Sequence, residues 1–261
     1  MLQKSLAYIS QFNRNLWVLS LGWFVSAMGF AVSIPFIAIY FHAKLGLSMT
    51  RIGLFFGAMA VIRSVFQFVG GEVSDRIERR YMLIYSQIIR AASFAIMAVA
   101  VYRHMGFWMI AASLMINSAL GAVFQPAANA MVADILPPEK RLDGYALTRS
   151  AMNFGWAAGP ALGGFMAGYS YGLLFLVSAA LTLGSGLVFV FFLQAPAQAL
   201  IADHFKFKDI RAIKDDPYLA WHSGLIFLIY LVHSQLIAPF SVYAVEMIKI
   251  SEHQLGLLYT L

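Results

Sequence analysis

The chain has 261 residues, of which 61% are hydrophobic and 11% are charged, whereas soluble domains carry about 25% charged residues. This composition excludes an ordinary soluble domain, because the apolar runs are too long for a soluble core. The net charge of +6 does not indicate a nucleic-acid-binding protein, since the basic residues are spread over several loops, and the lack of cysteine excludes a disulfide.

Seven apolar segments are each near or above the roughly 20 residues that a helix needs to cross a bilayer. The first is too long for the apolar region of a signal peptide, so we expect it to be retained as a span. An eighth segment begins at Gln254 and extends for about two turns to Leu261, which is too short to cross. The predicted spans are residues 16–41, 52–73, 82–102, 107–132, 145–169, 172–193 and 220–245.

The distribution of Lys and Arg predicts how these spans are oriented. If the N-terminus is cytoplasmic, eleven of the 18 Lys and Arg residues fall in inner segments, four in outer loops and three inside spans. Because cytoplasmic segments of membrane proteins carry the excess of positive charge, we expect a multi-pass protein of the cell membrane with a cytoplasmic N-terminus. Contact of the inner segments with anionic lipid is the expected by-product.

The segment between the second and third spans, Gly71-Glu-Val-Ser-Asp75-Arg76-Ile-Glu-Arg79-Arg80, concentrates charge between two apolar runs. Charge is rare in hydrocarbon unless it has a function or a partner, so this segment is predicted to be a short loop at a membrane face. Gly71 would let the end of the second helix pack closely against a neighbour. Asp75 can accept backbone N–H groups at a helix start and attract nearby arginines.

Glycine recurs every four residues in the fifth span, at Gly155, Gly159 and Gly163, so the three share one helix face. Small residues on one face let another membrane helix approach closely. Pro160 removes one backbone hydrogen bond and bends the helix. Together with Gly164, these residues predict a closely packed and bent helix.

Arg63 lies 11 residues into the second span, about 16 Å along the helix and near the middle of the bilayer. Two interpretations stay open: a functional residue that faces a cavity, or a structural arginine held by helix C-termini and amides. Arg90 and Arg149 are predicted to lie nearer the inner ends of their spans and to extend toward the interface. His233 in the seventh span could take up a proton near neutral pH or form a hydrogen bond between helices.

The pattern G-x-x-x-D-R-x-x-R-R of residues 71–80, between a second and a third spanning helix, resembles the loop signature of the major facilitator superfamily of transporters. The pattern G-x-x-x-G-P-x-x-G-G of residues 155–164 resembles the fifth-span motif of its drug–proton antiporter branch, which is more common in exporters than in importers. Two positions depart from the family. Glu78 stands where glycine is usual, and Asn117 stands where the antiporters often carry an arginine, four residues before Gly121.

The resemblance implies two groups of functional residues. Asp134 ends the fourth span, where an acid opposes the helix macrodipole, and in this family the matching acid pairs with the loop arginine, here Arg79. The expected cytoplasmic gate comprises Gly71, Asp75, Arg76, Arg79, Arg80 and Asp134. The spans that line the central cavity in this family carry Trp23, Ser26, Met28, Phe30, Pro35, Asn117, Gln125, Pro126 and Asn153, to which we add Arg63 and His233 as candidate substrate residues. For most of these residues, contact with lipid or packing between helices is the better interpretation.

The resemblance covers essentially the whole chain and implies an all-α membrane protein with the major facilitator fold. It implies an N-terminal six-helix bundle in residues 1–193, a cytoplasmic linker in residues 194–217, and the first one to two helices of a second bundle in residues 218–261. The expected function is alternating-access transport, namely export of small amphipathic or drug-like solutes in exchange for protons. The alternatives are an uptake symporter or facilitator for a small solute, with anions among the candidates, and a truncated fragment that transports nothing.

The residues themselves limit this expectation in two ways. The predicted spans lack an Asp or Glu at mid-membrane, so proton coupling rests mainly on the resemblance and on His233. The pattern G-x-x-x-x-G-K-[ST] is absent, so ATP is not expected to drive transport within this chain. We expect no enzymatic activity, no cofactor, no metal site and no nucleic-acid partner.

Overall fold

The computed structural model describes residues 12–74, 76–195 and 215–260. Within these residues the chain forms helices and no strand, which confirms the predicted all-α class. The elements are α2 (Arg14–Ile39), η1 (Tyr40–Lys44), α3 (Met49–Ser74), α4 (Arg79–Tyr102), α5 (Phe107–Ile135), η2 (Pro138–Lys140), α6 (Arg141–Tyr169), α7 (Tyr171–Phe192), α9 (Pro217–Ile237), α10 (Pro239–Glu246) and α11 (Glu252–Thr260).

Polar side chains fix the starts of three of these helices. Asn13 before α2, Ser170 before α7 and Asp216 before α9 each accept a hydrogen bond from backbone N–H groups of the first turn. The first N–H groups of a helix have no partner within the helix, so a side-chain oxygen at this position stabilises the start. Short polar residues thus set where each apolar run becomes helical.

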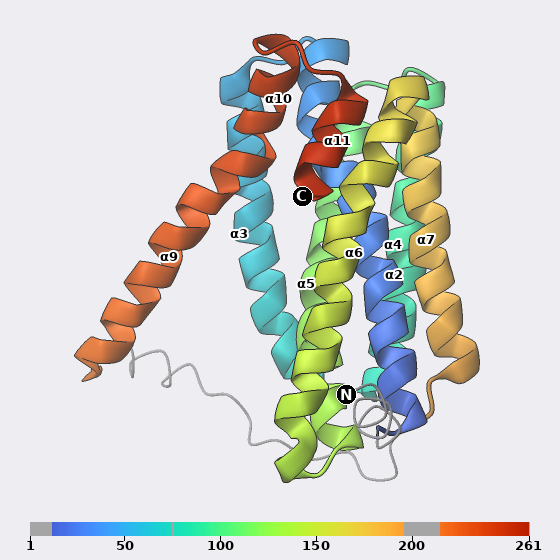
Figure 1. The fold of residues 1–261 in the computed structure, drawn as a ribbon, viewed down its shortest axis with the longest axis vertical. Helices are drawn as coiled ribbons and strands as arrows, with labels where there is room; N and C mark the ends of the chain where they lie inside the picture. The colour runs from blue at the N-terminus through green and yellow to red at the C-terminus, as the bar shows by residue number, and fades with distance from the viewer. Residues whose placement is uncertain (1–11, 75, 196–214, 261) are drawn as a thin grey trace, which may run out of the picture.

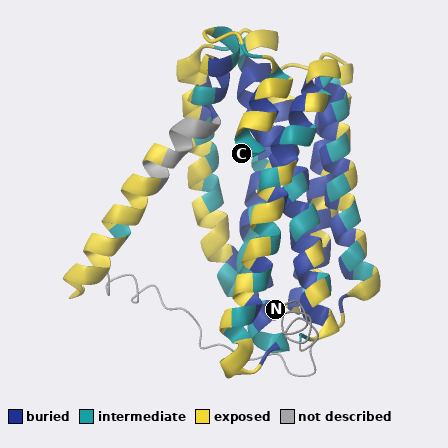
Figure 2. Cartoon of the chain, viewed as in Figure 1, coloured by how far each residue is buried: buried dark blue, intermediate teal, exposed yellow. Residues whose placement is uncertain are grey.

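Helices α2 to α7 stand together as one bundle (Figure 1). Helix α2 packs against α6 and α7, α4 packs against α5 and α7, and α3 packs against α5. The most apolar stretch of α2 and η1 is 83% buried, whereas that of α3 is 11% buried. Helix α2 is therefore the core of the bundle and α3 its outermost helix, as the burial colours show (Figure 2).

The remaining described helices are α9, α10 and α11. Helices α10 and α11 lie at the end of the bundle where α7 begins, whereas α9 runs from that end outward and leans away from the bundle (Figure 1). Helix α10 packs against α2, and α11 packs against α6. We refer to this end as the Tyr171 end, at the top of Figure 1, and to the opposite end, where α4 begins, as the Arg79 end.

Five of the described helical segments are long and apolar enough to cross a membrane, namely Arg14–Lys44, Met49–Ser74, Arg79–Tyr102, Phe107–Ile135 and Tyr171–Phe192. The chain is therefore a multi-pass membrane protein. Helix α6, which matches the predicted span 145–169, has the length but is less apolar, because polar residues and several glycines interrupt it.

The predicted span 220–245 is wrong as a single helix. It is divided into α9 and α10, which meet at Ala238. Pro239 causes the break, because proline has no N–H and its ring clashes with the preceding turn of a helix. Most of the predicted linker, residues 196–214, lies outside the described residues.

Candidate functional site

At the Arg79 end, one buried ion pair joins α4 to α5. Arg79 Nη1 contacts Asp134 Oδ2, and the two side chains are 7% and 1% exposed. Arg79 is the first residue of α4 and Asp134 lies in the last turn of α5, so each charge opposes the macrodipole of its own helix. Placing the two charges together offsets both unfavourable positions.

Two other described arginines of this loop contact different partners. Arg76 contacts Glu72 one turn earlier, with Nη2 and Oε1 2.6 Å apart and the Arg76 side chain 65% exposed. Arg80 Nη2 donates a hydrogen bond of 3.1 Å to the carbonyl oxygen of Val190, near the end of α7. Asp75, which we expected in the same charge network, lies outside the described residues.

The close packing predicted at Gly71 occurs one residue earlier. A Cβ on Gly71 would meet no atom of the described chain within 4 Å. A Cβ on Gly70 would lie 2.7 Å from the Cα of Val123, because this face of α3 contacts α5. The shift by one residue turns the glycine by about 100° around the helix, which the sequence pattern alone does not reveal.

The glycines of α6 lie where its backbone meets α2. A Cβ on Gly155 would lie 2.5 Å from the carbonyl oxygen of Phe24, and one on Gly159 would lie 2.5 Å from the Cβ of Ala31. A Cβ on Gly163 would overlap the carbonyl oxygen of Val32. This face is the closely packed seam that the four-residue spacing predicts.

Gly164 lies on a different face of α6 and meets α11 instead. A Cβ on Gly164 would lie 2.5 Å from the carbonyl oxygen of Glu252 and 3.0 Å from the Cα of Gly256. A Cβ on Gly256 would in turn overlap the carbonyl oxygen of Pro160, which is buried. Gly256 was not predicted, although a glycine in the short eighth apolar segment is the signal that could have revealed this contact.

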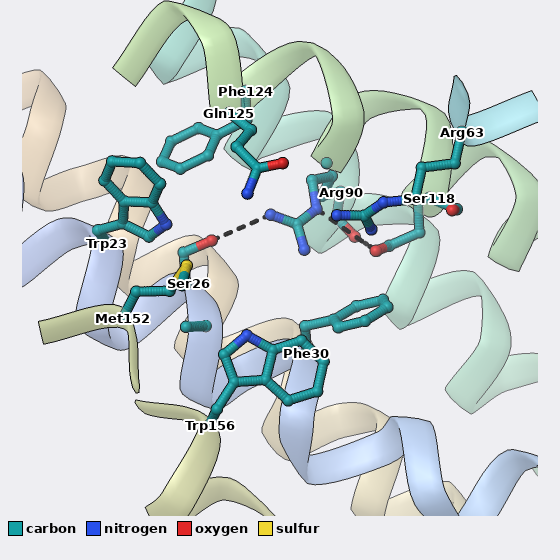
Figure 3. Close-up of a pocket in the computed structure, with 13 residues that line it drawn as sticks. Trp23, Ser26, Phe30, Arg63, Arg90, Ser118, Phe124, Gln125, Met152 and Trp156 are labelled. Atoms are coloured by element: carbon teal, nitrogen blue, oxygen red, sulfur yellow. Dashed lines mark hydrogen bonds between the residues drawn. The ribbon is translucent and has the colours of Figure 1, made fainter. Parts of the chain in front are cut away.

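The middle of the bundle contains a small polar cavity that is open on one side (Figure 3). It measures about 60 Å³, which is room for a few water molecules. Helices α2, α3, α4, α5 and α6 all contribute to it. Its lining residues are Trp23, Ser26, Ala27, Phe30, Arg63, Arg90, Asn117, Ser118, Gly121, Phe124, Gln125, Met152 and Trp156.

Arg90 lies at the centre of a buried hydrogen-bond network in this cavity. Its Nη1 donates to Ser26 Oγ at 3.0 Å and to Gln87 Oε1 at 3.3 Å, and its Nε donates to Asn117 Oδ1 at 3.3 Å. The side chain is 5% exposed, and its Cζ lies 5.8 Å from the ring centroid of Phe30. The prediction that Arg90 extends to the interface is therefore wrong, because α4 begins at Arg79 and not at residue 82. Residue 90 thus lies about 16 Å along the helix.

Several residues expected at the cavity do lie there. Trp23, Ser26, Arg63, Asn117 and Gln125 line it, whereas Asn153 is exposed and is not part of the lining. The side chain of His233 lies outside the described residues. Ser118, Met152 and Trp156 also line the cavity and were not predicted, because they have no charge or unusual spacing to single them out.

A second recess opens beside this cavity on the side of α6. It measures about 400 Å³ and is lined by Trp23, Asn129, Tyr145, Thr148 and Arg149. Trp23 lines both spaces, so they adjoin. The lining of the two spaces, as far as the described chain forms it, contains three arginines and no Asp or Glu.

Two polar contacts join the bundle to the later helices at the Tyr171 end, and neither was predicted. His42 Nε2 lies 3.1 Å from Glu246 Oε2, and the Tyr171 hydroxyl donates a hydrogen bond to Glu252 Oε1. These contacts join η1 and α7 of the bundle to the residues that end α10 and begin α11. Together with the Gly164–Gly256 contact, they hold the later helices against the bundle.

Comparisons with known proteins agree with this architecture. A family profile described as Major Facilitator Superfamily matches residues 19–261. The chain is 30% identical over 189 residues to the uncharacterized MFS-type transporter YqjV of Bacillus subtilis, covering 70% of this chain and 45% of YqjV. It is 28% identical over 185 residues to the multidrug resistance protein MdtH of Edwardsiella ictaluri, covering 71% of this chain and 43% of MdtH.

A solved structure shares the fold. The crystal structure of a bacterial homologue of the human lysosomal transporter Spinster, in an inward-facing and unoccupied conformation, superposes with a TM-score of 0.76. The identity is 16%, and the match covers 94% of this chain and 58% of that protein. The chain spans about half the length of the curated relatives it matches. The profile match over residues 19–261, with the six-helix bundle and the polar cavity at its centre, shows that this chain belongs to the Major Facilitator Superfamily.

Proposed function

We propose that this chain forms the first bundle, and the beginning of the second, of a secondary transporter that exports small amphipathic solutes in exchange for protons. The observation that carries the proposal is the central cavity. Polar and aromatic side chains from five helices meet in the middle of an otherwise apolar bundle, and buried polar groups at that depth mark substrate or ion pathways in membrane proteins.

Two further observations support export over uptake. The glycine and proline residues of 155–164 form the close α2–α6 seam, and their pattern resembles that of drug–proton antiporters. The relative MdtH is named a multidrug resistance protein. We propose that the Arg79 end faces the cytoplasm, in agreement with the Lys and Arg distribution.

In this proposal the parts of the fold have separate roles in alternating access. Arg79 and Asp134, with Asp75, form the cytoplasmic gate, and α6 supplies the bending helix through Pro160. His233 is the proposed proton acceptor, since the described lining of the cavity contains no Asp or Glu. The contacts at the Tyr171 end must break for the cavity to open outward.

Inside-out membrane vesicles that contain the intact protein test this function. Respiration acidifies such vesicles, and an acridine dye reports the pH gradient. Exchange of substrate for protons predicts that an amphipathic drug added outside enters the vesicles and partly dissipates the gradient. Vesicles without the protein give the control. Drug uptake that is identical with and without the gradient would instead indicate a facilitator and contradict proton exchange.

Weakening the Tyr171 end is expected to open the cavity toward the outside. The changes Glu246→Gln and Glu252→Gln together remove two charge-assisted contacts, each worth about 1.5–3 kcal/mol. The sequence contains no cysteine, so a single Ala27→Cys change provides a label site in the cavity lining. We expect labelling of this introduced cysteine by an impermeant maleimide, added to intact cells, to rise about tenfold or more.

The matched control for that experiment is Glu139→Gln, which alters an exposed acid at the Arg79 end. It should leave the labelling rate of the introduced cysteine unchanged. Equal labelling in all three proteins would show that the contacts of Glu246 and Glu252 do not hold the cavity closed. Faster labelling from the opposite membrane face would reverse the proposed orientation.

A further inference from the structure

We propose that the central cavity binds an organic anion, with the negative group of the ligand held by Arg63 and Arg90 and its aromatic or apolar body held by the surrounding rings. This inference rests on the proposed function, because it names the substrate class of the same cavity. The ligand would be an amphipathic aromatic carboxylate or an acid of similar charge.

The charge of the cavity is the first reason. Arg63 from α3 and Arg90 from α4 both line it, and their positive charges are close enough to repel each other. The described lining contains no Asp or Glu, and the described hydrogen bonds of Arg90 all go to neutral side chains. A buried cation in a membrane interior is costly unless an opposite charge compensates it, and a bound anion supplies that charge to Arg90.

The way Arg90 is held is the second reason. Its three hydrogen bonds go to the neutral side chains of Ser26, Gln87 and Asn117, and use only Nε and Nη1. Within the described residues Nη2 makes no hydrogen bond, and it lies beside Gly121, which has no side chain to cover it. The network therefore fixes the direction of the guanidinium group while leaving its charge and one donor nitrogen for a ligand.

Ser118 provides an independent observation. Its side chain lines the cavity and is 1% exposed, yet its Oγ has no hydrogen-bond partner among the described residues. A buried hydroxyl without a partner is unfavourable because it has lost its hydrogen bond to water, so such groups in native proteins call for an explanation. A ligand oxygen in the cavity would accept this hydrogen bond together with those of the arginines.

The rings of the cavity define the rest of the ligand. Trp23 and Phe124 meet edge to face with centroids 5.7 Å apart, and Phe30 and Trp156 form a similar pair, also at 5.7 Å. The two pairs lie on either side of the Ser26–Arg90 hydrogen bond in Figure 3. Aromatic walls around a few polar groups are typical of sites for amphipathic small molecules.

The size of the two spaces fits a ligand with a small head and a larger body. The cavity of about 60 Å³ holds a carboxylate group but not an aromatic molecule, whereas the adjoining recess of about 400 Å³ does. Trp23 lines both, and Arg149 adds a positive charge to the recess. An anion would therefore meet only positive or neutral side chains in the described part of its path.

The test compares two ligands of equal size and opposite charge on the intact, purified protein. Pyrenebutyrate is an aromatic carboxylate, and a pyrenebutyl trimethylammonium salt carries the same ring and chain with a cation. Because Trp23 and Trp156 line the cavity, energy transfer from tryptophan to pyrene reports binding. We expect saturable binding of pyrenebutyrate at least tenfold tighter than that of the cation.

Three variants locate the site. Arg63→Gln should weaken pyrenebutyrate binding about 10- to 100-fold, and Ser118→Ala should weaken it less, because Arg63 supplies a positive charge as well as hydrogen bonds whereas Ser118 supplies one hydrogen bond. Arg63→Lys keeps the charge and should recover part of the affinity. The control is Arg51→Gln, which removes an exposed arginine of the same helix outside the cavity and should change nothing. The thermal midpoint of each variant checks that it is folded.

Equal binding of the two ligands, preference for the cation, or equal effects of Arg63→Gln and Arg51→Gln would overturn the inference. The vesicle experiment keeps the proposed export separate from it. Export of cationic dyes by a protein that does not bind pyrenebutyrate would refute the anion site and leave export standing. Binding of pyrenebutyrate that depends on Arg63, without any proton-linked flux, would support the anion site and refute proton-linked export.

Discussion

Replacing Arg79 by glutamine is expected to lower the free energy of unfolding by about 3–5 kcal/mol, because a buried carboxylate loses its cation. The side chains of Arg79 and Asp134 are 7% and 1% exposed, so water cannot take the place of the missing partner. Denaturant unfolding of the purified protein in detergent, followed by circular dichroism, measures the loss. It is the largest effect that we expect from a single substitution in this chain.

Arg76→Gln is the matched control for this prediction. Arg76 lies three residues earlier and contacts Glu72, and its side chain is 65% exposed. Losing this exposed contact should lower the free energy of unfolding by less than about 1 kcal/mol. The double variant Arg79→Gln with Asp134→Asn should be more stable than the sum of the single losses predicts, since neither charge is then left alone. Similar losses for Arg76→Gln and Arg79→Gln would contradict a stabilising role of the buried pair.

The second large effect is expected from Gly163→Ala, which should destabilise the protein by about 1–3 kcal/mol. The added Cβ would overlap the carbonyl oxygen of Val32 and lie 2.8 Å from the ring of Phe36. A backbone carbonyl cannot change rotamer, so α6 must move away from α2, the helix at the core of the bundle. The thermal midpoint of the purified protein, or its free energy of unfolding, measures this loss.

Gly168→Ala provides the comparison on the same helix. A Cβ on Gly168 would meet nothing within 4 Å, and alanine favours a helix over glycine by about 1 kcal/mol. We therefore expect Gly168→Ala to be neutral or stabilising, which is the opposite sign to Gly163→Ala. A stabilised Gly163→Ala variant would show that α2 and α6 pack less closely than the contacts of Gly163 indicate.

Local rules were enough to predict much of the fold. Apolar runs of sufficient length and polar residues at their starts gave the helices of the first bundle, and the spacing of Gly155, Gly159 and Gly163 gave the face that meets α2. The position of Asp134 at a helix C-terminus indicated a cationic partner, and the family resemblance indicated which one. The ion pair with Arg79 is present, while its role in gating stays a proposal.

The predictions that failed depended on small errors in position. The predicted start of α4, residue 82, is three residues too late. The prediction therefore placed Arg90 near the membrane interface instead of in the central cavity, where it forms its hydrogen bonds. Gly70, not Gly71, meets α5, because one residue changes the face of a helix. The contacts of His42 and Tyr171 with Glu246 and Glu252 join residues far apart in sequence, and such pairs follow from tertiary packing rather than from any local pattern.

The meeting of Gly164 with Gly256 has a mechanical consequence. Two backbones touch there without side chains between them, so the contact resists compression but has no interlocking rotamers to resist turning. It lies toward the Tyr171 end, near the point where α11 meets α6 (Figure 1). If one bundle rotates about this pivot, each atom is displaced in proportion to its distance from it. The displacement is then small beside α11 and larger toward the opposite end, where Arg79 and Asp134 form their ion pair.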